Sequence, residues 1–371
     1  MSKKIRVLLI ANEESTLYNF RREVISAFVR AGMEVIACYP FGEHTDEMKE
    51  LGCELVDIEV SRHGKNILQD LKLYNTCKAL LKEYKPDVVL TYTVKPNIYG
   101  SLACSKMGIK YINNITGLGT VLQNENVLSK LILTLQKYAY KNTNCVFFQN
   151  EENKRYMIEK GVISSNTPTE VLPGSGVNLE KQSFETYPER KEALNFAVIS
   201  RIRKDKGYQE LFEAAERINN KYPGTVFHIA GWYEEGELSE TLKELVEKDI
   251  VKYHGSVSQD EVHVILTKCD CLIHPSYHEG MANVILEAAA TGRPVVATDI
   301  PGCREGFDEG VTGYSCEPQN TKSLYNAIEK MINTPYEERV KMGKKARNKM
   351  EKQFDRNLVA KKYIERIKSI V

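Results

Sequence analysis

Two glutamates in the stretch PSYHEGMANVILEAAATGRPVVATD carry the clearest sign of chemistry. Glu279 ends a loop, and Glu287 lies eight residues later on the helix expected to follow. Eight helical residues span about 12 Å, which is too far for the paired carboxylates of a glycosidase. The two carboxylates suit instead the two ends of one extended ligand. Backbone N–H groups that open the helix suit phosphate or sugar oxygens, and they belong to Gly280, Met281, Ala282 and Asn283.

Two basic residues form a second candidate group. The segment SRIRKDKGYQELFEA puts Arg201 at the carboxyl end of a predicted strand and Lys206 just before a predicted helix. A planar guanidinium, an ammonium and the N–H groups of a helix start together suit a diphosphate. Solvated loop cations are the alternative interpretation of this pair.

Short β-like runs alternate with helical patterns in both halves of the chain. The expected strands cover 5–11, 33–39, 53–60, 87–92, 109–114 and 144–150, then 194–200, 225–231, 251–255, 271–275 and 294–298. The expected helices cover 17–31, 67–84, 97–107 and 127–141, then 207–220, 237–247, 259–268, 282–291, 320–333 and 336–368. This alternation predicts an α/β protein with two doubly wound, Rossmann-like domains facing a central cleft. The polar stretch 173–190, rich in Gly and Pro, is the expected linker.

Composition and motifs exclude several classes of protein. The 371 residues are 42% hydrophobic with a net charge of +1, and no apolar run approaches the roughly 20 residues of a membrane span. Nine cysteines without the spacing of a disulfide framework indicate a reducing cytoplasm. Neither a complete dinucleotide fingerprint nor a phosphate-binding GxxxxGK[ST] motif occurs, and Asp-x-Asp is absent.

A zinc site is the alternative for one crowded segment. His263, Cys269, Cys271, His274 and His278 lie within sixteen residues. The segment CDCLIHP alternates as a buried strand, however, which puts its two cysteines on one face and its histidine on the other. We therefore expect no metal.

Together, these motifs resemble a known family. The E-x7-E arrangement, the downstream GRPVVATD and the upstream SRIRKDKG look like the retaining glycosyltransferases of family 4, which have the GT-B fold. KPDVV, KPNIYGSLA and TGLG in the first half resemble the bacterial polysaccharide branch of that family. The resemblance spans nearly the whole chain. It implies an acceptor domain over 1–180, a nucleotide-sugar domain over 191–350 and a terminal helix over 351–371 that returns to the first domain.

The resemblance also implies roles for the candidate residues. Arg201 and Lys206 would hold the donor diphosphate without a metal, and Glu279 would hold hydroxyls of the transferred sugar. Glu287 would bind the ribose, and the loop around 255–258 would frame the base. The expected donor-binding set is Gly280, Met281, Ala282, Asn283, Glu287, Gly255 and Val257.

The acceptor side departs from the family pattern. ANEESTLYNFRRE replaces a frequent Gly-Gly after the first strand, and NNITGLG replaces a frequent histidine after the fifth. For each candidate the alternative is a capping or solvated loop residue. The candidates at strand ends are Asn12, Tyr18, Arg21, Lys95, Asn97, Thr116 and Gly117.

The resulting hypothesis is a cytoplasmic, metal-independent, retaining transferase. It would move a hexose or N-acetylamino sugar from a nucleotide diphosphate sugar, with UDP as the expected nucleotide, to a lipid-linked or envelope polysaccharide acceptor. No cofactor and no nucleic-acid partner are expected. A UDP-sugar 2-epimerase of the same architecture and a non-catalytic nucleotide-sugar-binding protein are the alternatives.

An unequal distribution of charge suggests a membrane partner. Residues 88–150 hold six lysines against one acid, and residues 339–371 hold twelve Lys or Arg against three acids. The predicted helix VLSKLILTLQKYAYK adds an apolar side, so reversible contact with the anionic inner face of a membrane is expected. Packing of the same side on the sheet is the alternative. The residues concerned are Leu128, Leu131, Ile132 and Leu135 beside Lys130, Lys137 and Lys141.

Overall fold

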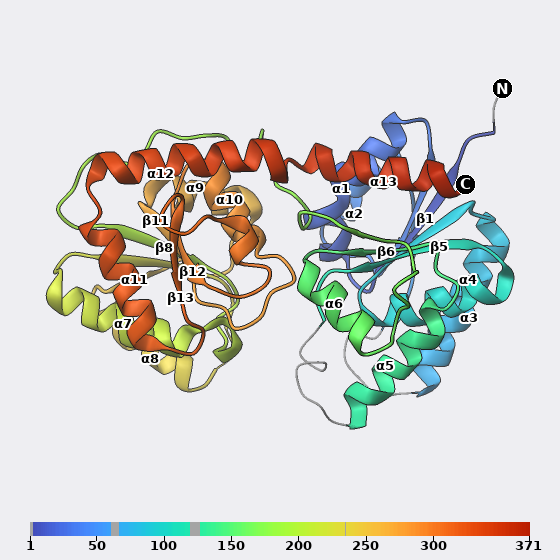
Figure 1. Cartoon of the computed structure of the whole chain (residues 1–371), viewed down its shortest axis with the longest axis horizontal. Helices are drawn as coiled ribbons and strands as arrows, with labels where there is room; N and C mark the ends of the chain where they lie inside the picture. Colours follow the sequence, from blue (N-terminus) through green and yellow to red (C-terminus); the bar gives the residue numbers. More distant parts are fainter. Residues whose placement is uncertain (1–2, 61–66, 119–126, 234) are drawn as a thin grey trace. The chain divides into compact units, whose positions relative to one another are not determined.

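The structure, a computed structural model, describes residues 3–60, 67–118, 127–233 and 235–371 (Figure 1). The chain divides into two compact units, one made of Met1–Ser175 with Arg356–Val371 and the other of Gly176–Asp355. Each unit contains one sheet of parallel strands with helices on both faces. The expected class of two doubly wound α/β domains is therefore confirmed.

The first unit has a seven-stranded sheet in the order β3-β2-β1-β4-β5-β6-β7. Its central strands are continuous buried runs such as RVLLI and VVLTY, the pattern of parallel strands covered on both faces. The strands are β1 Arg6–Ile10, β2 Glu34–Tyr39, β3 Glu54–Asp57, β4 Val88–Tyr92, β5 Lys110–Ile115, β6 Cys145–Phe148 and β7 Thr169–Val171. The helices are α1 Glu14–Arg30, α2 Thr45–Lys49, α3 Ile67–Tyr84, the π-helix η1 Pro96–Gly100, α4 Ser101–Met107, α5 Val127–Tyr140, α6 Glu151–Glu159 and α13 Arg356–Ile370.

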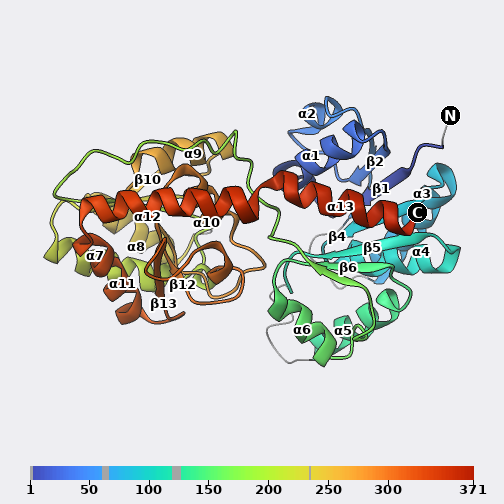
Figure 2. The same ribbon diagram turned by 45° about the horizontal axis from the view of Figure 1, so that its top comes forward.

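Helix α13, from the end of the chain, completes the core of the first unit. Figure 2 shows it beside α1, and its Val359 and Tyr363 are buried in the core that covers one face of the sheet. The Tyr363 hydroxyl donates a hydrogen bond of 2.6 Å to the side-chain oxygen of Asn114. Ion pairs with acids of the same unit hold two of its basic residues: Arg356 with Glu23 and Arg366 with Glu170.

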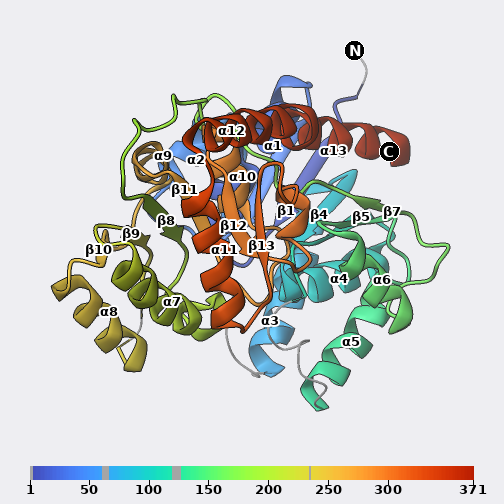
Figure 3. The same cartoon turned by 60° about the vertical axis from the view of Figure 1, so that its left-hand side comes forward.

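The second unit has a six-stranded sheet in the order β10-β9-β8-β11-β12-β13. Helices α7, α8 and α11 bury their apolar sides on one face, while α9 and α10 cover the other (Figure 3). The strands are β8 Asn195–Ile199, β9 Val226–Ala230, β10 Val251–Tyr253, β11 Cys271–His274, β12 Val295–Thr298 and β13 Gly313–Cys316. The helices are η3 Lys204–Lys206, α7 Tyr208–Lys221, α8 Glu237–Glu247, α9 Gln259–Lys268, α10 Asn283–Thr291, η4 Arg304–Gly306, α11 Thr321–Asn333, α12 Tyr336–Lys349 and the π-helix η5 Met350–Phe354.

The single terminal helix predicted over 336–368 is wrong. It is broken into α12, η5 and α13, because Asp355 adopts extended ψ of 127°. The backbone there pairs with the chain that enters the second unit, since the Val177 N–H donates to the Phe354 carbonyl at 2.8 Å. Several short elements were also not predicted, because none is long enough to show a period: α2, α6, β7 and β13.

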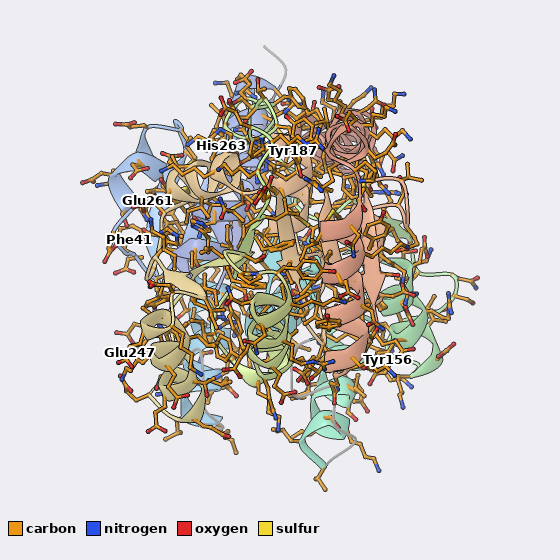
Figure 4. All side chains as sticks on the ribbon, turned by 90° about the vertical axis from the view of Figure 1, so that its left-hand side faces the viewer. Phe41, Tyr156, Tyr187, Glu247, Glu261 and His263 are labelled. Carbon is orange, nitrogen blue, oxygen red and sulfur yellow. The ribbon has the colours of Figure 1, made fainter. Side chains whose placement is uncertain are left out.

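Most of the stretch expected to be a linker packs on the second unit. The fully buried Arg293 holds it, because its guanidinium donates to the carbonyls of Glu185 and Thr186. The same guanidinium donates to carbonyls at the ends of α9 and α10, namely those of Leu266, Thr267, Thr291 and Gly292. Figure 4 labels two further anchors: the Tyr187 hydroxyl donates to the Asp270 carbonyl at 2.7 Å, and His263 lies 3.0 Å from the Gln182 side-chain oxygen.

We predict that Arg293→Met destabilises the second unit by about 3–5 kcal/mol, because it leaves buried carbonyls without a donor. Urea unfolding followed by circular dichroism measures the change. Arg190→Met, at an exposed position of the same stretch, is the control and should stay within about 0.5 kcal/mol of wild type. Equal stability of the two variants would contradict the role of Arg293.

Candidate functional site

The candidate site of the second unit lies where the strand order of its sheet reverses. Strand β8 is central, with β9 on one side and β11 on the other, and the loops that leave β8 and β11 at their carboxyl ends run in opposite directions. Arg201 and Lys206 follow β8, and Glu279 follows β11. The residues predicted to carry the chemistry therefore leave the two strands that flank the position where doubly wound sheets bind ligands.

Gly207 brings Lys206 to this position. Its φ is 74°, and a Cβ atom there would lie 2.1 Å from the carbonyl oxygen of Pro275, so only glycine allows this approach. The Tyr277 N–H donates to the Asp205 carbonyl at 3.0 Å. The turn that carries Lys206 is thus packed directly on the loop that carries Glu279.

Lys206, His274 and Glu279 form one ionic cluster. The Lys206 ammonium lies 2.6 Å from Glu279 Oε1, and His274 Nε2 lies 3.0 Å from the same oxygen. The Glu279 side chain is 14% exposed. Burial opposes its ionisation, but the hydrogen bond from His274 and the charge of Lys206 prevail and lower the pKa of Glu279 to about 2. The exposed Arg201 has no part in this cluster.

The start of α10 is less open than the sequence suggested. The Ala282 N–H donates to the Gly302 carbonyl at 2.8 Å, so it is not available to a ligand as predicted. Met281 is buried against Val177, so its side chain belongs to the core. Asn283 Oδ1 is buried without a hydrogen-bond partner among the described residues. Gly280 and Glu287 are half-buried.

Three loops at the carboxyl edge of the sheet are joined through their backbones. The Gly231 N–H donates to the Gly255 carbonyl at 2.7 Å, and a Cβ at Gly231 would lie 1.9 Å from the Ser200 carbonyl oxygen. Val257 is partly buried against the core. A capping box between Ser258 and Glu261, which Figure 4 labels, ends this loop at the start of α9. Gly255 and Arg201 therefore lie in loops of the same edge.

The sequence interpretation missed other groups at this edge. The sequence pattern presents His274 only as a possible zinc ligand, although the strand-end dipeptide His-Pro is a signal that can mark it. The single tryptophan, Trp232, follows Gly231 and is half-exposed. Away from the edge, His228 in the middle of β9 has its Nδ1 atom 3.0 Å from His254 Nε2, and burial together with the charge of His254 lowers the pKa of His228 to about 4.

In the first unit, several acceptor-side candidates lie at the carboxyl edge of the sheet. Asn12 follows β1 and Lys95 follows β4, which flank the point where this strand order reverses. Lys95 forms an ion pair with Asp70 at 2.9 Å. Thr116 and Gly117 follow β5 and are half-buried. The next glycine of the TGLG motif, Gly119, lies outside the described residues.

The other acceptor-side candidates are used within the first unit. Arg21 is 2% exposed and donates to the Ser175 hydroxyl at 2.5 Å. Asn97 is buried, donates to the Asn114 carbonyl at 2.9 Å and accepts from Thr91, so its amide holds η1 in place. Tyr18 donates to Glu47. The expectation that all these side chains face a ligand is therefore corrected for Arg21 and Asn97, which are internal supports.

In the part of the chain that the structure describes, no group of three or more His, Cys, Asp and Glu side chains is placed to hold a metal ion. Within the same residues, no helix combines the length and apolarity needed to cross a bilayer.

Both units match glycosyltransferase families. Residues 180–349 match the family described as glycosyl transferases group 1, and residues 6–150 match glycosyl transferase 4-like. The chain thus belongs to the family 4 type of glycosyltransferases, as its motifs indicated. Its two units are the two domains of the GT-B fold.

The chain is also similar to individual glycosyltransferases in sequence and to a solved glycosyltransferase structure in fold. The chain is 27% identical over 380 residues to N,N'-diacetylbacillosaminyl-diphospho-undecaprenol alpha-1,3-N-acetylgalactosaminyltransferase of Campylobacter jejuni, covering 97% of this chain and 98% of that one. It is 26% identical to UDP-Gal:alpha-D-GlcNAc-diphosphoundecaprenol alpha-1,3-galactosyltransferase of Escherichia coli, covering 82% and 80%. A glycosyltransferase structure from Rickettsia africae shares the fold, with a TM-score of 0.80, 20% identity and 99% coverage of both chains.

The ion pair of Glu279 predicts a pH-dependent difference between wild type and Glu279→Gln. An unfolded Glu has a pKa of about 4.3, so the ionised carboxylate stabilises the fold above that pH, and this stabilisation disappears as the pH falls toward 2. We expect a difference in the free energy of unfolding of up to about 3 kcal/mol at pH 7 that shrinks steadily between pH 5 and pH 3. Urea unfolding at each pH measures it.

Glu240→Gln, on the exposed surface of α8, is the matched control and should remain within about 0.5 kcal/mol of wild type. A difference for Glu279→Gln that is equally large at pH 7 and pH 3 would show that the carboxylate is not ionised in the folded protein.

Proposed function

We propose that this glycosyltransferase moves a hexose or N-acetylamino sugar, with retention of configuration, from a UDP-sugar to a lipid-linked or envelope polysaccharide acceptor. The observation that carries the proposal is the Lys206–Glu279 pair at the reversal point of the second sheet. The pair places a cation suited to a diphosphate 2.6 Å from a carboxylate suited to sugar hydroxyls, so one nucleotide diphosphate sugar can reach both. The name of the Escherichia coli relative, which includes UDP-Gal, supports UDP as the nucleotide.

The proposed donor site assigns one task to each group. Lys206 and Arg201 bind the diphosphate and stabilise the charge that develops when it leaves, without a metal. Glu279 accepts hydrogen bonds from the transferred sugar, and Glu287 accepts them from the ribose. The loop with Gly255 and Val257 frames the base. During transfer the bond from the sugar C1 to the diphosphate breaks, an acceptor oxygen bonds to C1, and its proton passes to the departing diphosphate.

The acceptor is proposed to carry a polyprenyl diphosphate. The names of both relatives specify an undecaprenyl-diphosphate-linked sugar. Tyr18 on α1 remains a candidate for contact with it, as do four described residues at strand ends: Asn12, Lys95, Thr116 and Gly117. These four lie in the loops after β1, β4 and β5 at one edge of the sheet.

We predict that the wild-type protein slowly releases UDP from its donor without an acceptor, and that Lys206→Ala and Arg201→Ala each lower this rate by about 100-fold or more. Coupled detection of UDP measures the rate. Lys204→Ala, in the same turn but exposed, is the matched control and should stay within about twofold of wild type.

Glu287→Ala should instead weaken UDP binding by about tenfold, which Trp232 fluorescence can follow.

Other products would identify the alternatives. Appearance of a new UDP-sugar would indicate an epimerase, and tight binding without turnover would indicate a binding protein. With a polyprenyl-diphosphate sugar as acceptor, an α-linked product from an α-linked donor, determined by NMR, is the expected result. Inversion at C1 would refute only the proposed retention of configuration and would leave the transferase activity itself supported.

We further propose that α5 contacts the anionic inner face of a membrane. Val127, Leu131 and Tyr138 lie on one side of this helix and are 86%, 54% and 67% exposed. This side shares only Leu131 with the predicted one, because Leu128, Ile132 and Leu135 are half-buried. The exposed lysines of the helix and its end, which supply the complementary charge, are Lys130, Lys137 and Lys141.

A second exposed apolar group supports the same surface. Ile67, Leu68 and Leu71 at the start of α3 are exposed. Helices α3 and α5 both begin at the carboxyl edge of the first sheet, where the acceptor candidates also lie, and both views show these ends at the same side of the unit (Figures 1 and 3). A lipid-linked acceptor would therefore enter next to a surface suited to its membrane.

We predict that the protein floats with vesicles containing phosphatidylglycerol but not with neutral phosphatidylcholine vesicles, and that salt weakens the binding. Replacement of Lys130 and Lys137 by Glu should reduce binding by about tenfold or more. The same change at Lys344 and Lys345, which are exposed on α12 of the second unit, is the matched control. Equal loss in both pairs, or no preference for anionic vesicles, would exclude this surface.

A further inference from the structure

His274 is a buried histidine whose ring faces the proposed donor site. It ends β11, where it is paired in register with Ala297 of β12, and its side chain is only 5% exposed. Its Nε2 atom lies 3.0 Å from Glu279 Oε1. An ionised carboxylate can only accept hydrogen bonds, so Nε2 carries the proton. The rigid strand therefore supplies Glu279 with a fixed N–H donor.

The arrangement of donors around Glu279 is asymmetric. Lys206 and His274 both approach Oε1, whereas Oε2 has no hydrogen-bond donor within the described part of the chain. A carboxylate fixed through one oxygen presents the other in a defined direction. Oε2 is thus the atom placed to accept a hydrogen bond from a hydroxyl group of a bound sugar.

We propose that His274 is the positioning residue that keeps Glu279 in place while Lys206 changes its partner from Glu279 to the donor diphosphate. This inference rests on the proposed function. Lys206 carries one positive charge, and a diphosphate competes for it more strongly than a single carboxylate does. Once Lys206 turns, the N–H of His274 is the remaining described contact that orients Glu279.

The two donors differ in the number of rotatable side-chain bonds, which supports this division of tasks. Lys206 has a flexible four-carbon side chain on a short 3-10 turn, so its ammonium can move between two anions. His274 has two side-chain torsions and lies within a buried strand. The mobile group suits the ligand that arrives and leaves, and the rigid group suits the orientation of the sugar.

The proposal can be tested through the pH dependence of kcat. The acid limb is the pH range in which kcat falls on acidification, and its position should shift. The titratable groups around Glu279 are Lys206 from η3, His274 from β11 and the buried Cys303 thiol after β12, whose pKa burial raises. Loss of the His274 N–H removes a contact that lowers the pKa of Glu279. The carboxylate would then protonate at a higher pH, so turnover would fall earlier on acidification.

The experiment compares His274→Leu, which has no donor, with His274→Gln, whose amide N–H reaches toward the position of Nε2. We expect His274→Leu to lower kcat for donor hydrolysis by about 10–100-fold and to move the acid limb to higher pH, while UDP affinity measured by Trp232 fluorescence stays within about twofold. His274→Gln should recover most of kcat and of the acid limb. His263→Leu removes a partly buried histidine from α9 of the same unit and is the matched control.

The outcomes separate the two levels of inference. A wild-type protein that neither binds UDP nor turns over any UDP-sugar would refute the proposed function itself. An active wild type with a folded His274→Leu variant of equal kcat and unchanged acid limb would overturn the role of His274. If His274→Leu fails to fold, His274→Gln decides: a kcat as low as that of a Glu279→Gln variant would also overturn it.

Discussion

One carboxylate oxygen organises the second unit around its reversal point. Glu279 Oε1 accepts hydrogen bonds from a lysine that follows β8 and from a histidine that ends β11. A carboxylate this buried stays ionised because both donors face it, which is why its pKa falls to about 2 despite the cost of burial. The ionic contact therefore links the two strands between which doubly wound sheets bind ligands, and it holds a cation and an anion ready at that point.

Backbone approach makes this contact possible. Gly207 lets the Lys206 turn lie on Pro275, and Gly302 lies 2.8 Å, measured from a hypothetical Cβ, from the carbonyl oxygens of Glu279 and Gly280. Gly231 similarly joins the loops after β8, β9 and β10. Any side chain at these positions would push the loops apart. The shape of the proposed donor site thus depends on the positions of these glycines as much as on the charged groups.

The first unit uses polar groups differently. Arg21, Asn97 and Tyr363 lie in its interior. Asn97 and Tyr363 fix η1 and α13 to Asn114 of β5, and Arg21 joins α1 to Ser175 in the loop after β7. Their hydrogen bonds replace water that burial removes, so each side chain serves the position of an element. Two exposed apolar helix starts, those of α3 and α5, lie at the carboxyl edge of the same sheet.

The sequence alone determined the fold class, the family and the residues at the ends of β8 and β11, because buried parallel strands and glycine-bounded loops have strong local patterns. The resemblance to a known family, rather than any local pattern, placed Lys206 and Glu279 in one expected donor site, although 73 positions separate them. Only the tertiary structure decided that His274 and Lys206 both contact one oxygen of Glu279. It also decided that the Ala282 N–H donates to the Gly302 carbonyl and that Arg21 and Asn97 are buried inside the first unit. Those outcomes depend on side-chain direction and on contacts between distant segments, and neither leaves a periodic trace in the sequence.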